Sequence, residues 1–119
     1  MELGWCDVCL KVASAKLSRE FYEKMGFRRV EGEDSEGWAV VTNGEVRLGL
    51  YEAQHMGKDS VTLNFRGGNV PGIREKLEAK GLVFEALPSS MNPSNSAIVR
   101  DPDGYSVFFD TAPGERKKE

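Results

Sequence analysis

The stretches Phe21–Phe27 (FYEKMGF) and Lys76–Leu82 (KLEAKGL) decide the fold, because each ends a helical pattern with a glycine at the same place. These glycines, Gly26 and Gly81, lie 55 positions apart, so each copy takes about half of the chain. An apolar strand pattern precedes each helix, VCLKV in the first copy and VTLNF in the second. A unit of that size exposes an apolar sheet face that it cannot bury alone. The sequence therefore predicts a duplication whose copies pack together or against a partner chain.

Composition limits the class of protein. The 119 residues suit one domain of ordinary size, and 39% apolar with 29% charged residues is typical of a globular protein. The net charge is −3, and apart from Arg116–Lys118 the basic residues are scattered, which argues against nucleic-acid binding. No apolar stretch approaches the roughly 20 residues of a membrane helix, and the first residues do not resemble a secretory leader. We expect a cytoplasmic protein with no nucleic-acid or membrane partner.

The two cysteines form a C-x-x-C pattern, Cys6 to Cys9, inside an alternating apolar stretch. Redox dithiols of this form lie at a helix N-terminus, and zinc knuckles need a second pair. In a strand the two side chains point to opposite faces. We expect two small buried hydrophobic side chains, and a solvated His55.

Periodicity predicts the elements of the first half. Residues 5–12 alternate as a strand, Ser14 is a plausible N-cap, and Leu17, Phe21 and Met25 recur on one helical stripe. Short strands are expected at 27–30, 38–42 and 46–51. Asn43-Gly44, a strong hairpin signal, joins the last two, and 52–59 is expected to be a linker.

The second half repeats this order. A strand is expected at 61–65, with Val61, Leu63 and Phe65 toward a helix that begins near Pro71 and continues to Gly81. Further strands are expected at 82–86, 97–100 and 105–110, with a turn at 101–104. The polar loop 88–95 has a length and composition typical of functional or mobile loops. The tail, residues 113–119, is expected to be disordered.

These elements together resemble a known superfamily. The helix ending FYEKMGF, the repeated βαβββ order and the closing DPDGYSVFF of Asp101–Phe109 are similar to the vicinal oxygen chelate superfamily, which contains glyoxalase I, extradiol dioxygenases, fosfomycin-resistance enzymes and bleomycin-resistance proteins. The resemblance covers residues 4–112. It implies an α+β fold in which two tandem βαβββ units, about 4–52 and about 59–112, form a curved mixed sheet around a concave groove. Residues 1–112 are then a single domain.

The resemblance also indicates where a metal site would lie. Metal-dependent members take two ligands from each repeat, and the corresponding positions here are Asp7, Gly49, Ser60 and Phe108. Gly49 has no side chain, Phe108 cannot coordinate, and Ser60 is a poor ligand at neutral pH. One carboxylate does not hold a catalytic metal. We predict no metal and no cofactor, and only the linker residues Glu52, Gln54 and His55 could supply replacement ligands.

A small-molecule groove is the remaining hypothesis. If Asp7 faces inward, strand alternation brings aromatic and polar side chains beside it, a mixture typical of ligand pockets. Gly49 would leave room in this groove. The predicted ligand-binding residues are Trp5, Asp7, Arg47, Tyr51, Ser60, Asn64, Phe108 and Asp110. Alternatively the aromatic rings only fill a core, and Trp38 could belong to either face.

Three function classes stay open. The preferred one is metal-independent binding of a small amphipathic or cationic molecule, which is the sequestration found in bleomycin-resistance proteins and would imply antibiotic resistance. The alternative is a glyoxalase-like lyase or isomerase, or a dioxygenase-family enzyme, with a non-standard metal site or with Asp7 as a general base. The third is a structural or regulatory module. The resemblance further implies a homodimer with two equivalent grooves.

Overall fold

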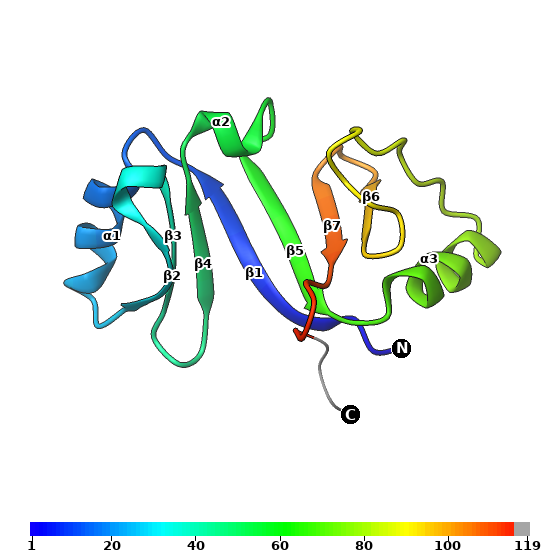
Figure 1. The fold of residues 1–119 in the computed structure, drawn as a ribbon, viewed down its shortest axis with the longest axis horizontal. Helices are drawn as coiled ribbons and strands as arrows, with labels where there is room; N and C mark the ends of the chain where they lie inside the picture. The colour runs from blue at the N-terminus through cyan, green and yellow to red at the C-terminus, as the bar shows by residue number, and fades with distance from the viewer. Residues whose placement is uncertain (116–119) are drawn as a thin grey trace. The chain divides into compact units, whose positions relative to one another are not determined.

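The computed structural model describes residues 1–115, which form an α+β fold with one mixed seven-stranded sheet (Figure 1). This confirms the predicted fold class. The hydrogen-bonded strand order is β2-β3-β4-β1-β5-β7-β6. In chain order the elements are β1 (Gly4–Lys11), α1 (Ala15–Glu23), β2 (Arg28–Glu33), the 3-10 helix η1 (Asp34–Glu36), β3 (Trp38–Thr42), β4 (Arg47–Tyr51), α2 (Ala53–Met56), β5 (Val61–Gly67), α3 (Val70–Ala79), β6 (Ser96–Arg100) and β7 (Ser106–Asp110).

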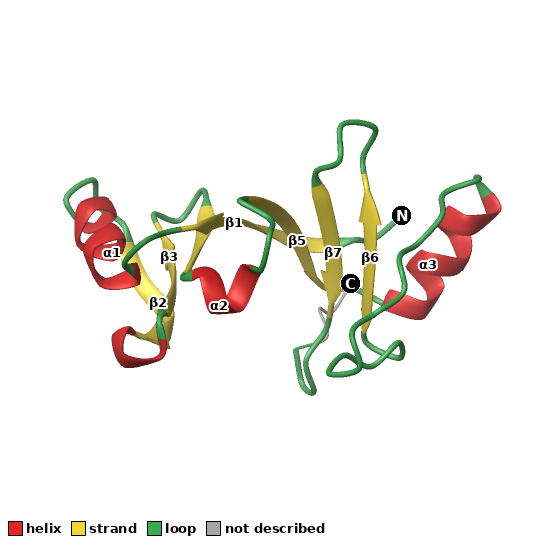
Figure 2. Ribbon diagram, turned by 90° about the horizontal axis from the view of Figure 1, so that it is seen from above, coloured by secondary structure: helices red, strands yellow, loops and turns green. Residues whose placement is uncertain are grey.

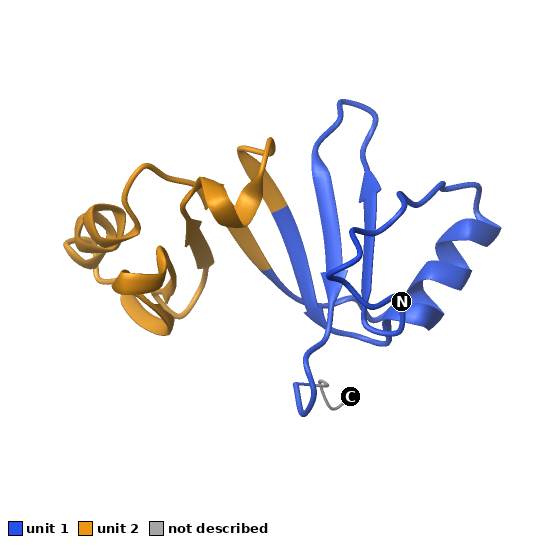
Figure 3. Cartoon of the chain, turned by 45° about the horizontal axis from the view of Figure 1, so that its top comes forward, with its two compact units in different colours: residues 1–6, 63–119 blue, residues 7–62 orange. Residues whose placement is uncertain are grey.

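The chain divides into two compact units, coloured separately in Figure 3. Unit 2 is residues 7–62, with α1 and the strands β2, β3 and β4. Unit 1 joins residues 1–6 to the chain from residue 63 onward, with α3, β6 and β7. The strands β1 and β5 each run through both units, so the chain crosses from one unit to the other along extended backbone.

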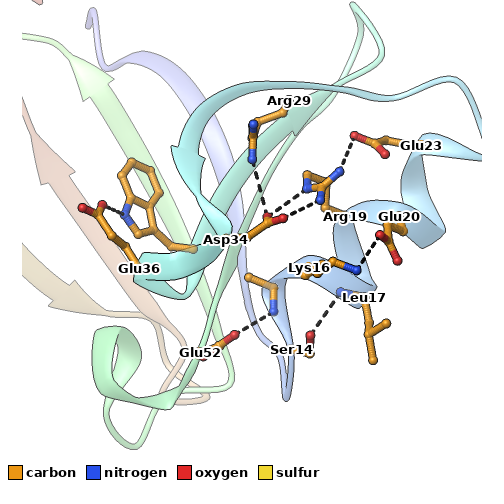
Figure 4. Close-up of polar contacts among 12 residues, drawn as sticks. Ser14, Lys16, Leu17, Arg19, Glu20, Glu23, Arg29, Asp34, Glu36 and Glu52 are labelled. Atoms are coloured by element: carbon orange, nitrogen blue, oxygen red, sulfur yellow. Dashed lines mark hydrogen bonds and ion pairs between the residues drawn. The ribbon is translucent and has the colours of Figure 1, made fainter.

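In unit 2, α1 begins where the sequence predicts. The hydroxyl of Ser14 accepts a hydrogen bond from the backbone N–H of Leu17 at 3.1 Å. A carboxylate oxygen of Glu52 accepts from the N–H of Ala15 at 2.9 Å, so a second side chain caps the same helix end (Figure 4). Ala15 is fully buried, and α1 packs on β3 and β4. The small Ala15 side chain lets the helix approach the sheet closely.

The apolar stripe of α1 points away from the sheet. Leu17 and Phe21 are 65% and 55% exposed, and Met25, in the turn after the helix, is 58% exposed, although such a stripe ordinarily faces a core. Charged contacts therefore add to the packing of Ala15 in holding the helix. Arg19 donates to both carboxylate oxygens of Asp34 at 3.0 and 2.6 Å, and to Glu23 at 2.9 Å (Figure 4). The hydrogen bond with Asp34 raises the pKa of Arg19, and the same bond lowers the pKa of Asp34.

In unit 1, α3 lies beside β6 (Figure 2), and it contributes to a buried apolar cluster. The side chain of Asn69 caps the helix by accepting from the N–H of Gly72 at 3.3 Å, and Pro71 lies in the first turn as expected. The buried cluster contains Val70, Ile73, Phe84, Ala97, Val99 and Phe109. Leu3, Phe65, Leu77 and Val107 pack against it, which confirms the expected helix-facing position of Phe65.

Two predicted segments differ in the structure. The expected linker 52–59 contains the short helix α2. The expected strand 82–86 forms no strand, because only Glu85 donates a backbone hydrogen bond to β6, at 2.9 Å to the carbonyl of Ile98, and Val83 is 84% exposed. The apolar residues of this segment therefore do not form the repeated ladder that a strand requires.

The predictions for the C-terminal tail and for the two cysteines have different outcomes. Residues 113–115 of the expected disordered tail form a turn in which Glu115 pairs with Arg66, and residues 116–119 lie outside the described residues. Cys9 is buried and Cys6 is partly buried in β1. Within residues 1–115, no helix is long and apolar enough to cross a membrane.

Candidate functional site

The candidate site is the face of the unit 2 sheet that carries Asp7, and strand register defines it. The strands β1 and β4 run parallel, with Asp7 beside Arg47, Cys9 beside Gly49 and Lys11 beside Tyr51. Neighbouring residues in a ladder point to the same side. The antiparallel strand β3 adds Thr42 beside Arg47, Val40 beside Gly49 and Trp38 beside Tyr51. We call these nine residues the Asp7 face.

A charged cluster occupies one end of this face. The guanidinium of Arg47 donates to Asp7 from Nε at 2.5 Å and from Nη2 at 3.3 Å, and Nη2 also donates to Glu31 of β2 at 3.1 Å. The side chain of Asp7 is 2% exposed, whereas Arg47 and Glu31 are 25% and 35% exposed. The hydrogen bond with Asp7 raises the pKa of Arg47. One guanidinium therefore serves two carboxylates and holds both oxygens of Asp7.

An aromatic cluster occupies the other end. The rings of Trp38 and Tyr51 stack with centroids 5.6 Å apart and planes 3° from parallel. The ring of His55 meets Tyr51 edge-on at 6.0 Å, and its Nε2 lies 2.7 Å from the carbonyl oxygen of Glu36. The indole N–H of Trp38 donates to the Glu36 carboxylate at 3.4 Å (Figure 4). His55 is thus exposed but bonded, rather than simply solvated as expected.

The structure answers the open question about Trp38, which lies on the Asp7 face. A signal for this was present in the sequence. The hairpin at Asn43-Gly44 has an even-numbered loop, which pairs even residues of β3 with odd residues of β4. Any even loop length therefore places Trp38 on the same side as Tyr51 and Arg47. The contribution of Glu31 had no such signal, because a bulge between Arg29 and Glu31 shifts the register of β2.

Gly49 does not leave room for a ligand, contrary to the expectation. A Cβ atom at this position would lie 2.6 Å from Cε2 of Tyr51 and 3.0 Å from Sγ of Cys9. The Tyr51 ring therefore lies over the glycine and uses the space that a larger residue would take. Lys11 is also engaged, because its Nζ donates to the carbonyl of Gly57 at 2.5 Å.

The eight predicted ligand-binding residues divide equally between the units. Unit 2 holds Asp7, Arg47, Tyr51 and Ser60, and Unit 1 holds Trp5, Asn64, Phe108 and Asp110. The structure brings the first three together on the Asp7 face. Ser60 is exposed ahead of β5, and its carbonyl accepts from the N–H of Lys11 at 2.9 Å.

The unit 1 residues form their own group of contacts. The side-chain amide of Asn64 donates to the carbonyl of Phe108 at 3.2 Å and to the carboxylate of Asp110 at 2.9 Å. The guanidinium of Arg66 lies over the ring of Trp5, 5.9 Å from its centroid. Sequence reasoning missed Arg66, although its alternation with Asn64 along β5 could have indicated it.

The donor set does not fit the metal site of the resemblance. The guanidinium of Arg47 engages both oxygens of Asp7, and the potential replacement ligands Glu52 and His55 are bonded to Ala15 and Glu36. Within the described residues 1–115, no three His, Cys, Asp or Glu side chains group so as to hold a metal ion. When the two repeats are aligned on their helix caps, Ser14 and Asn69, the counterpart of Asp7 is Thr62. The neutral hydroxyl of Thr62 is no better a metal ligand than that of Ser60.

Sequence comparison finds neither a matching family model nor a matching curated protein. Solved structures do match. A protein from Legionella pneumophila named as a NAD-dependent benzaldehyde dehydrogenase has a TM-score of 0.73 at 20% identity, with 90% of this chain and 98% of that chain covered. A glyoxalase/bleomycin resistance/dioxygenase superfamily member from Vibrio splendidus 12B01 has a TM-score of 0.64 at 16% identity, with 91% and 98% covered.

A bleomycin-binding protein complexed with bleomycin matches more weakly, with a TM-score of 0.36, 17% identity, and 87% and 94% of the two chains covered. At these identities the matches establish the fold and not the activity. The strand order, the repeated helices and the coverage of nearly the whole chain agree with the resemblance stated from the sequence. The chain has the fold of the glyoxalase/bleomycin resistance/dioxygenase superfamily.

Proposed function

We propose that the protein binds a small amphipathic or cationic molecule on the Asp7 face, without a metal ion or cofactor. The observation that carries the proposal is the pairing of an aromatic stack, Trp38 with Tyr51, and a carboxylate-rich cluster on one side of one sheet. Aromatic faces attract flat rings and cations, and carboxylates select positive charge. A site with both groups suits a ligand that carries a ring and a cationic group.

The spacing and charge of the two ends support this ligand class. Arg47 and Tyr51 are four positions apart on β4, which corresponds to about 13 Å at about 3.3 Å per residue. Asp7 and Glu31 share the single guanidinium of Arg47, and the carboxylate of Glu36 lies beside Trp38. The amine of Lys11 is held by the carbonyl of Gly57. The net formal charge of these side chains is negative, and a bound cation would neutralise it.

The residues of unit 1, namely Trp5, Asn64, Phe108 and Asp110, stay predicted ligand contacts, as does Ser60 in unit 2. Sequestration of the bleomycin-resistance type, and antibiotic resistance with it, belongs to this proposal. The bleomycin-binding protein binds bleomycin, but at a TM-score of 0.36 it is too dissimilar to support the same ligand for this chain. The proposal therefore depends on the aromatic and acidic groups of the Asp7 face.

The enzyme alternative has less support. A general base must offer an oxygen lone pair to the substrate within hydrogen-bond reach. Arg47 already donates to both oxygens of Asp7, and Asp7 is almost completely buried. A glyoxalase-like lyase or isomerase, or a dioxygenase-family enzyme, would need this ion pair to open, or ligands from elsewhere.

Calorimetric titration with matched naphthalene derivatives tests the proposal. We expect 1-naphthylmethylammonium to bind at least tenfold more tightly than 1-naphthoate, because the ring is the same and only the charge differs. Trp38→Leu or Tyr51→Ala should weaken the cation at least tenfold. Tyr105→Ala, which changes an aromatic side chain that is 56% exposed in unit 1, is the control and should bind normally. The proposal fails if Trp38→Leu and Tyr51→Ala leave the affinity for the cation unchanged, or if they weaken 1-naphthoate as much as the cation.

A homodimer is part of the proposal because the resemblance implies one. Static light scattering at micromolar concentration should give a mass about twice that of the 13.2 kDa chain. Elemental analysis of the same sample should find no stoichiometric transition metal. A full equivalent of zinc, nickel, iron or manganese, removed by chelator together with an activity, would replace binding with catalysis as the favoured function.

A further inference from the structure

A second group of side chains, in unit 1, has the chemistry of an anion site. Arg66 of β5 lies over the indole ring of Trp5, with its guanidinium carbon 5.9 Å from the ring centroid. The approach is close because Gly4, with φ of 91°, lies against the backbone of β5; a Cβ there would be 1.9 Å from the carbonyl oxygen of Arg66. Only glycine tolerates this conformation and contact. The backbone therefore places the guanidinium and the indole together.

The anion at this site is supplied by the chain itself. The carboxylate of Glu115 forms an ion pair with Nη2 of Arg66, and the two side chains are 14% (Arg66) and 13% (Glu115) exposed. The other oxygen of the carboxylate accepts from the N–H of Ala112 at 2.8 Å, within a turn closed by the N–H of Glu115 bonding to the carbonyl of Ala112 at 2.9 Å. A shielded guanidinium beside an aromatic ring thus holds a carboxylate carried by an irregular segment.

Among the described residues 1–115, hydrogen bonds of Thr111 also fasten that segment. Thr111 donates from its hydroxyl to the carbonyl of Gly68 at 2.6 Å and from its N–H to the carbonyl of Asn95 at 3.1 Å. The next residues, 112–114, are exposed. The segment buries little apolar surface, so its release exposes few groups that depend on it. Glu115 can therefore be displaced without disturbing the apolar cluster under α3.

We propose that Arg66 and Trp5 form a binding site for a small aromatic carboxylate, and that Glu115 occupies this site as an intramolecular substitute for the ligand. A guanidinium forms paired, charge-assisted hydrogen bonds with a planar carboxylate, and its flat face stacks on an aromatic ring. A ligand carboxylate would take the place of the Glu115 carboxylate, and a ligand ring would contact the indole. The tethered carboxylate competes at high effective concentration, so it lowers the apparent affinity of the free ligand.

Binding of phenylacetate to variants of the full chain tests the proposal. All variants carry Trp38→Phe, so that Trp5 is the sole tryptophan and its fluorescence reports the site. Glu115→Gln removes the competing charge and keeps an oxygen for the N–H of Ala112, and Glu115→Ala removes the side chain entirely. The matched control is Glu78→Gln, which removes a carboxylate from the exposed ion pair with Arg74 in the same unit.

We expect Glu115→Gln and Glu115→Ala to bind phenylacetate at least tenfold more tightly than the Trp38→Phe parent, and Glu78→Gln to match the parent. The uncharged 2-phenylacetamide and the cationic phenethylamine should bind at least tenfold more weakly than phenylacetate, and acetate should bind weakly because it lacks the ring. Arg66→Gln added to Glu115→Gln should abolish the gain. Arg66→Lys, which keeps the charge and loses the planar fork, should lose most of it.

The proposal fails if phenylacetate leaves Trp5 fluorescence unchanged in both Glu115 variants while circular dichroism shows that they are folded. It also fails if the Arg66 variants bind as tightly as Glu115→Gln alone, or if acid and amide bind equally. Should Arg66→Gln not fold, Arg66→Lys decides the question. A loss of stability in the Glu115 variants without a gain in carboxylate affinity would mean that the pair is only structural.

Discussion

The helices α1 and α3 follow similar patterns in the sequence but pack on the strands of their units in different ways. The helix α3 turns Val70 and Ile73 into a buried cluster with Phe84, Val99 and Phe109. The helix α1 turns its apolar stripe, with Phe21 at the centre, toward solvent. A cluster of buried side chains thus holds α3, whereas α1 packs on the sheet through the single buried residue Ala15 and is further held by Arg19, Asp34 and the caps at Ser14 and Glu52. Apolar periodicity identifies residues that share a stripe, but the partner surface decides whether that stripe is buried.

The largest expected effect tests this contrast directly. Phe109→Ala should lower the free energy of unfolding by about 3–5 kcal/mol, because it removes a ring that is 3% exposed and stacked on Phe65. Phe21→Ala, the same change on the exposed stripe, should alter it by less than about 0.5 kcal/mol. Urea unfolding followed by circular dichroism measures both. A loss above about 1.5 kcal/mol for Phe21→Ala would show that the stripe of α1 is covered in solution.

The second comparison concerns ion pairs. Asp7→Ala should cost about 3 kcal/mol, because it leaves the partly buried guanidinium of Arg47 without its main partner. Adding Arg47→Met should recover part of that loss. Glu78→Gln, in an exposed pair of unit 1, should cost less than about 0.5 kcal/mol. Denaturant midpoints of the four proteins give the values. If Asp7→Ala is as mild as Glu78→Gln, the cluster on the Asp7 face contributes little to the fold.

An intermediate effect is expected at Gly49. Gly49→Ala should destabilise the protein by about 1–2 kcal/mol, since the new Cβ would meet the Tyr51 ring at 2.6 Å. Adding Tyr51→Ala should remove the clash, so the two changes together should cost less than their sum. A double-mutant cycle from thermal unfolding measures the coupling. Simple additivity would mean that Tyr51 leaves Gly49 uncovered in solution.

The smallest effects should come from the helix caps. Asn69→Ala removes the one cap described for α3 and should cost about 1 kcal/mol. Ser14→Ala should cost about 0.5 kcal/mol, because Glu52 still accepts from the first N–H group of α1. When Glu52→Gln is added to Ser14→Ala, the cost at α1 should rise to that of Asn69→Ala at α3, since the charge at that end of α1 is then lost. A larger cost at Ser14 than at Asn69 would contradict this order.

Local signals in the sequence were sufficient for most of the fold. Ser14 and the Asn43-Gly44 hairpin act through hydrogen bonds within a few residues, so their positions could be predicted. The cap at Asn69 was not predicted, although it is equally local. The segment 82–86 could not, because the absence of a strand there depends on how many ladder bonds β6 accepts. The same is true of the stripe at Phe21, whose exposure depends on tertiary packing.

The candidate site was less accessible to prediction. Alternation placed Asp7, Arg47 and Tyr51 on one face, and the structure has them there. The pairing of Arg47 with Glu31 depends on the bulge in β2, and the position of the Tyr51 ring over Gly49 depends on a side-chain rotamer. Neither has a signature in residue type or spacing. Contacts that join distant strands through long side chains are therefore the part of the site that sequence patterns do not specify.

The placement of the Tyr51 ring has a consequence for protein engineering. A designer who wished to place a metal ligand at position 49 would choose glutamate, and its first side-chain carbon would collide with that ring. Moving the ring aside would break its stack with Trp38 and its edge contact with His55. A single substitution at position 49 therefore does not add a metal ligand to this face without displacing the Tyr51 ring. Positions 49 and 51 would have to change together, with a new partner found for Trp38.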